Sequence, residues 1–120
     1  MIKAGEVALL RFQFSDPPKM KICLCFCIEQ GLFFIISTKP YRWAPPDSQV
    51  TVFKEELACL DHDSYLDTSK AYEFDLHVIA RGVQRGVYPL APSALSRIKN
   101  ALSSQRYLPE DQRIKAISNL

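Results

Sequence analysis

Residues 5 to 38 read GEVALLRFQFSDPPKMKICLCFCIEQGLFFIIST, from Gly5 to Thr38. Two turns, at Pro17-Pro18 and at residues 29–31, divide this stretch into three apolar runs. Each run is short and rich in aromatic or β-branched residues, which is typical of consecutive antiparallel strands. We therefore expect a three-stranded meander with strands at residues 6–14, 21–29 and 32–37.

The second run predicts a central strand, because it is apolar on both faces. Cysteines occupy one face at Cys23, Cys25 and Cys27, and large apolar side chains alternate with them. Neighbouring cysteines on one strand face are roughly 6.5 Å or more apart, too far for a relaxed disulfide. We interpret them as buried thiols in a reducing compartment. A Cys-x-Cys-x-Cys metal site is the alternative, but it lacks the usual spacing and a second ligand pair.

The rest of the chain predicts further short strands followed by helices. Strands are expected at 49–53, 65–72 and 74–80, a helical turn at 54–60, and a turn at 81–86. Pro92 suits the first position of a helix, which we expect to reach Ser104 and to pack on the sheet through Leu95, Ile98 and Leu102. A shorter helix should begin at Pro109. The fold class is mainly β with C-terminal α: five to seven strands in a strongly curved sheet with a terminal helix.

Composition bounds the functional classes. With 120 residues, 48% of them apolar, the chain suits one globular domain. We assign that domain to residues 1–105 and a tail with a short helix to residues 106–120. No apolar run reaches the roughly 18 residues of a membrane span, and the N-terminus lacks signal-peptide features, so we expect a cytoplasmic protein without membrane association.

Charge is segregated along the chain. Residues 1–43 carry six Lys/Arg and three Asp/Glu, residues 44–80 two and eight, and residues 81–120 seven and two. Two basic outer thirds are compatible with a basic face for nucleic acid, although charge runs often form only a solvated surface. The loop after residue 37 mixes cations with aromatics: Lys39, Tyr41, Arg42 and Trp43. This mixture stacks bases and holds phosphates, so these residues are RNA-binding candidates; alternatively they cover the end of a barrel or a subunit interface.

The opening from Gly5 to Asp16 resembles the GD-I-V-x-V-x-F-P-F-T-D opening of the PemK/MazF toxins, the ribonucleases of type II toxin–antitoxin systems. The order of elements also looks similar over roughly residues 4–102. The resemblance implies a small SH3-like β-barrel with a C-terminal helix. It further implies a homodimer, a cognate antitoxin as partner, and metal-independent cleavage of single-stranded RNA without a cofactor.

The resemblance also implies where catalysis would lie. Where the family has a catalytic Arg-Pro, this chain has Lys21-Ile22, with Lys19 nearby. Ser37 and Thr38 match the hydroxyl position that faces the scissile phosphate. Lysine offers a point charge where arginine offers a fork. The alternative function is therefore a non-catalytic binding or interaction module that has lost the arginine.

Other groupings of polar residues are weaker alternatives. Asp16 is a candidate base or a turn former before proline. His62 and His77 are candidates for an acid–base pair. Asp61, Asp63 and Asp67 suggest a divalent cation site, but the glycine and terminal glutamate of a calcium loop are absent. A homodimer is also expected on physical grounds, because a two-sided apolar meander with an aromatic loop exposes more apolar surface than one small barrel hides.

Overall fold

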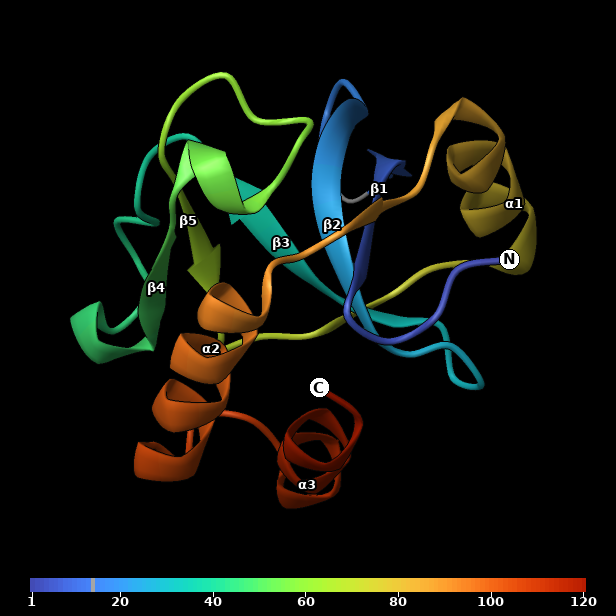
Figure 1. Ribbon diagram of the computed structural model, residues 1–120. Coiled ribbons are helices and arrows are strands. Elements are labelled where there is room, and N and C mark those ends of the chain that lie inside the picture. The colour runs from blue at the N-terminus through green and yellow to red at the C-terminus, as the bar shows by residue number, and fades with distance from the viewer. Residues whose placement is uncertain (14) are drawn as a thin grey trace.

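The computed structural model describes residues 1–13 and 15–120 as one curled sheet with helices on both sides (Figure 1). The strands are β1 (Glu6–Phe12), β2 (Lys19–Cys27), β3 (Leu32–Ser37), β4 (Gln49–Val52), β5 (Ser64–Asp67), β6 (Tyr72–Glu73) and β7 (Tyr88–Pro89). The helices are α1 (Leu76–Arg85), α2 (Pro92–Ser104) and α3 (Glu110–Asn119), with 3-10 turns at Pro46–Ser48 and Lys54–Glu56.

The sheet runs in the order β4-β5-β3-β2-β1-β7, with β6 added to β3, and its pairs are antiparallel. β4 and β7 end the path, so the sheet curls without closing on itself over the described residues. The expected fold class is confirmed: mainly β, a curled antiparallel sheet with C-terminal helices, consistent with a small barrel. The expected extension of the first strand to Phe14 lies outside the described residues.

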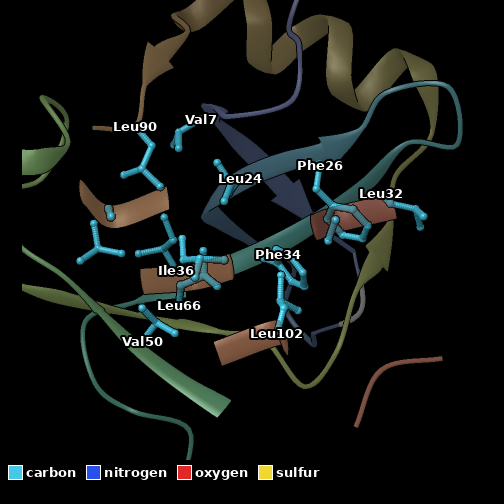
Figure 2. Close-up of a cluster of buried hydrophobic side chains, with 14 of the residues drawn as sticks. Val7, Leu24, Phe26, Leu32, Phe34, Ile36, Val50, Leu66, Leu90 and Leu102 are labelled. Carbon is cyan, nitrogen blue, oxygen red and sulfur yellow. The ribbon is translucent and has the colours of Figure 1, made fainter. Parts of the chain in front are cut away.

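β2 is a central strand between β1 and β3, as its two apolar faces predict. One face joins a first core with α2 and α3, in which Leu24 and Phe26 are fully buried (Figure 2). The other face joins a second core, in which Cys23 and Cys25 are fully buried. Cys27 belongs to the first core instead, because the β2–β3 register shifts between Cys25 and Cys27. The prediction that all three cysteines share one face was therefore wrong for Cys27.

The helix α1 corrects the expectation of a strand at 74–80 and a turn at 81–86. Val78, Ile79 and Gly82 are buried on one side of it, which is helical spacing. Gly82 is not a turn former: a β-carbon there would lie 2.8 Å from the Leu9 carbonyl oxygen, so the glycine lets α1 approach β1. The helix ends at Gly86, whose φ of 146° favours glycine.

α1 also changes the reasoning about a dimer. The second core lies between the sheet and α1, and its buried residues include Phe33, Ile35 and Val78. The apolar second face of the meander, which suggested a homodimer, is therefore covered within the chain.

The two C-terminal helices cover the first core. Ile98 and Leu102 of α2 are fully buried and Leu95 packs partly buried against them, as predicted. α3 falls in the segment expected to be a tail and packs on α2 and β2, with Ala116 buried. Asn119 Nδ2 donates to the Phe26 carbonyl oxygen at 2.8 Å, which ties the end of α3 to β2.

Glu56 joins α2 to the β4 end of the sheet. Its carboxylate pairs with Arg97 and accepts hydrogen bonds from Ser93 Oγ at 2.5 Å and from the Phe53 backbone N–H at 2.9 Å. Arg97 Nη2 also donates to the Thr51 carbonyl oxygen at 3.0 Å. Burial acts to raise the pKa of Glu56, but these hydrogen bonds outweigh it and the pKa is lowered.

Replacing Glu56 by glutamine should lower the free energy of unfolding at pH 7 by about 1–2 kcal/mol, since Arg97 is left partly buried without its partner. A lowered folded-state pKa stabilises the protein above the unfolded pKa of about 4.3, and the effect is lost as the pH falls through the folded pKa. The parent and Glu56→Gln should therefore converge in urea unfolding below about pH 4. The exposed neighbour Glu55→Gln is the control, and an equal deficit of Glu56→Gln at both pH values would contradict the assignment.

Gly82→Ala should destabilise the protein by about 1–3 kcal/mol, because the new methyl group meets the backbone of β1 and α1 must shift outward. In the exposed face of the same helix, Gln84→Ala should change stability by less than about 0.5 kcal/mol. Chemical unfolding of both variants measures the difference. Equal stability of the two would show that α1 does not pack against β1 as described.

Candidate functional site

The start of β2 and the end of β3 lie at the same end of the sheet. Ile22 pairs with Ile36, so Lys21 and Ser37 come next on neighbouring strands. Lys21 also pairs with Leu10 of β1, and Lys19 with Phe12. The two strand ends that were expected to carry catalytic residues therefore meet at one sheet end.

Ser37 is a buried hydroxyl without a partner. Its Oγ is inaccessible to solvent and has no hydrogen bond with any described residue. The Tyr41 side chain lies near enough for the serine to act on the phenol, though not in hydrogen-bonding geometry. A buried hydroxyl without a partner costs free energy, so this atom is not explained by packing alone.

Two half-buried tyrosines lie beside Ser37. Burial raises the pKa of Tyr41; Ser37 opposes this effect, and the nearby Asp67 and Cys23 add to it. Burial also raises the pKa of Tyr72, with Tyr41 and Asp67 as further causes. Both phenols are therefore protonated at neutral pH and can donate hydrogen bonds. We refer to Lys21, Ser37, Tyr41, Asp67 and Tyr72 as the Tyr41 cluster.

Asp67, at the end of β5, holds the cluster in place. Its Oδ1 accepts hydrogen bonds from Ser48 Oγ at 3.0 Å, Gln49 Nε2 at 3.1 Å, and the backbone N–H and Oγ of Ser69 at 2.9 and 2.7 Å. The Tyr41 backbone N–H donates to Gln49 Oε1 at 3.3 Å. Asp67 is thus joined to Tyr41 through Gln49, and the loop before β4 is fixed against β5.

The aromatic and cationic loop after β3 projects from this end of the sheet. Thr38, Lys39, Arg42 and Trp43 are exposed. Trp43 is 91% exposed, and Arg42 Cζ lies 5.8 Å from the centre of its ring. A second cation–π contact places Lys70 Nζ 5.0 Å from the Tyr72 ring. Cations against aromatic rings at a surface form a platform on which bases can stack.

Cysteine chemistry does not fit this site. Burial raises the pKa of Cys23 and of Cys25 to about 12, so both thiols are neutral at physiological pH. The nucleophilic form is the thiolate, which these two cysteines do not supply.

The weaker alternatives from the sequence are not brought together. His62 Nδ1 lies 2.5 Å from Asp61, whereas His77 lies on α1, and no hydrogen bond joins the two histidines within the described residues. Asp63 accepts from the Lys54 backbone N–H at 3.0 Å, apart from the buried Asp67 network. Over residues 1–13 and 15–120, no three His, Cys, Asp or Glu side chains are grouped as metal ligands.

The sequence reading missed Gln49 and Tyr72 and treated Asp67 only as a calcium ligand. Each joins the cluster through long-range pairing: Gln49 pairs with Asp67, and Tyr72 with Phe33. The one signal available was the polar run Asp67-Thr68-Ser69 directly after an apolar strand residue.

No protein-family model matches the chain, and a search of curated proteins gives no match. The resemblance to the PemK/MazF toxins and the roles it implies for Lys19, Lys21, Ser37 and Thr38 therefore stay predictions. In the described part of the chain, every helix is too short or too polar to cross a membrane.

Ser37→Ala should raise the free energy of unfolding by up to about 1 kcal/mol, because it removes a buried hydroxyl without a partner. Ser64→Ala is a matched control: this buried serine donates to the His62 carbonyl oxygen at 3.2 Å, so its loss should destabilise by about 1 kcal/mol. Urea unfolding of both variants compares them. Destabilisation of similar size in both would mean that Ser37 has a structural partner.

Proposed function

We propose that this protein binds single-stranded RNA at the sheet end formed by the Tyr41 cluster and the loop from Thr38 to Trp43. The observation that supports this most directly is Trp43, which is almost fully exposed with a guanidinium over its ring. A large aromatic side chain in water loses the free energy of burial, so its exposure favours a binding role. Single strands offer both the base faces and the phosphates that such a pair recognises.

The polar groups of the Tyr41 cluster suit a phosphate beside the stacked base. Lys21 contributes a positive charge, and the protonated phenols and the Ser37 hydroxyl are donors. In free protein the Ser37 hydroxyl has no partner, and a phosphate oxygen would satisfy it. Lys39 and Arg42 extend the positive surface along the loop.

Trp43 is the only tryptophan in the chain, so its fluorescence reports directly on stacking. Titration with a single-stranded RNA should quench this fluorescence. Trp43→Ala should weaken binding of a labelled RNA by roughly ten-fold or more, since stacking contributes about 1–3 kcal/mol per base.

Ile114→Ala, an exposed apolar residue on α3, is the control and should bind like the parent. Lys21→Ala should weaken binding and flatten its salt dependence, whereas the exposed Lys54→Ala should do neither. If RNA leaves the fluorescence of the parent unchanged and Trp43→Ala binds normally, the proposal is wrong.

Metal-independent RNA cleavage is the second candidate function. In it the ribose 2′-oxygen attacks phosphorus, its proton goes to a base, and the bond to the 5′-oxygen breaks as that oxygen gains a proton. Tyr41 is placed to donate a proton and Lys21 to stabilise charge on the phosphate. Asp67 is the carboxylate of the cluster, but its Oδ1 already accepts four hydrogen bonds. Binding is therefore the better-supported function.

Incubation with RNA in the presence of a chelator separates the two functions. A toxin-like endoribonuclease would produce fragments, and the double variant Lys21→Ala, Thr38→Ala would not. Cleavage by the double variant at the parent's rate would refute the site. Binding without cleavage by the parent would identify a non-catalytic binding module.

The remaining parts of the proposal follow from the resemblance to PemK/MazF toxins. They are a cytoplasmic toxin, a cognate antitoxin and a homodimer. With the second face of the meander covered by α1, the exposed aromatic loop is the surface left for a dimer contact. Light scattering of the parent and of Trp43→Ala compares their masses.

A further inference from the structure

A groove runs between α1 and the end of the β1–β2 pair, with a volume of about 480 Å³. Arg11, Gln13 and Met20 line it from the sheet side, and His77, Arg81 and Arg85 from α1. A shallower hollow continues over the outer side of α1, lined by His77, Arg81 and Arg85 with their neighbours. Together they make a continuous basic surface, which we name the α1 groove.

The charges of the α1 groove are not used by the fold. Its lining includes three arginines and a histidine but no aspartate or glutamate. Among the described residues no ion pair joins Arg11, Arg81 or Arg85 to an acid. Like charges gathered without counter-charges cost free energy, which a bound anion would recover.

Arg85 is held in a fixed position within the groove. Its Nη1 donates to the Leu9 carbonyl oxygen at 2.8 Å, where the edge of β1 runs past α1. A guanidinium has five N–H donors, so most of them remain for a ligand. Arginine forks match the oxygens of phosphate in a way that lysine does not.

The groove lies round the same sheet end as the Tyr41 cluster. Arg11 pairs with Met20, and the next pair along the strands is Phe12 with Lys19. Successive side chains on a strand point to opposite faces, so Arg11 and Met20 lie on one face and Lys19 and Lys21 on the other. A chain that bends round this end meets both positive surfaces. Met20, 42% exposed, adds apolar area for a base.

We infer that the α1 groove binds the phosphodiester backbone of a single-stranded RNA beyond the nucleotides that contact Trp43. This inference rests on the proposed function and assigns Arg11 and Arg81 to phosphate contacts. The continuous run of cations from Lys21 to Arg81 favours a ligand with evenly spaced charges and base faces over an acidic protein segment.

The test compares a double variant, Arg11→Gln with Arg81→Gln, with a control that removes two exposed lysines elsewhere, Lys3→Gln with Lys54→Gln. Arg85 is left in place because it is bonded to β1. Circular dichroism checks that both variants fold. The RNA probes are an oligonucleotide of about 4 nucleotides and one of about 16, within the range of single-strand site sizes.

For the long RNA, the groove variant should bind roughly ten-fold more weakly than the control, and the slope of log affinity against log salt should fall by about 1.4, or about 0.7 per phosphate contact. For the short RNA, Trp43 quenching should be the same in both. Equal long-RNA affinity and slope in the two variants would overturn the inference. So would stronger competition for the groove by polyglutamate than by the long RNA.

These outcomes are separable from failure of the proposed function. If the parent shows no Trp43 quenching with either RNA, the proposed site at Trp43 fails. Loss of long-RNA binding in the groove variant would support the groove even then. Quenching that persists while the groove variant behaves like the control refutes the groove alone.

Discussion

Burial of both faces of β2 is the constraint on which the rest of the structure depends. Phe26 faces one core and Cys23 the other, and both are inaccessible to solvent. A strand that is apolar on both sides needs a covering layer on each. The chain supplies α2 and α3 for one face and α1 for the other, and the curl of the sheet lets the layers fit (Figure 1).

The elements that local patterns define were predictable from the sequence. The third strand, Leu32–Ser37, and the helix from Pro92 to Ser104 have the predicted bounds, since turn residues and helical spacing mark both clearly. α1 was missed because Phe74 to Ala80 is short and apolar, which does not separate strand from helix. Its two glycines were interpreted as a turn, although Gly82 serves the approach to β1. The Cys27 face was missed because a register shift has no local sequence signature.

The candidate site was predictable only where hairpin geometry reaches. A turn at Gln30-Gly31 is enough to place Lys21 near Ser37, because β2 and β3 are consecutive. Asp67 reaches Tyr41 through Gln49, which requires the β4–β5 pairing and a long connection. Contacts of that kind depend on the whole fold. The sequence therefore indicated the cations and the aromatic loop, but not the carboxylate that positions them.

The segregation of charge along the chain gains a spatial meaning in the fold. Arg11 comes from the basic first third and Arg81 from the basic last third, and α1 brings them to one groove. The acidic middle third contributes Asp67, which is buried, and Glu56, which is paired with Arg97. Those acids hold structure together, whereas the groove cations and the Ser37 hydroxyl lack partners of their own among the described residues. Groups that lower stability without contributing to the fold are expected at binding sites, because there a ligand completes the interactions that folding leaves unmade.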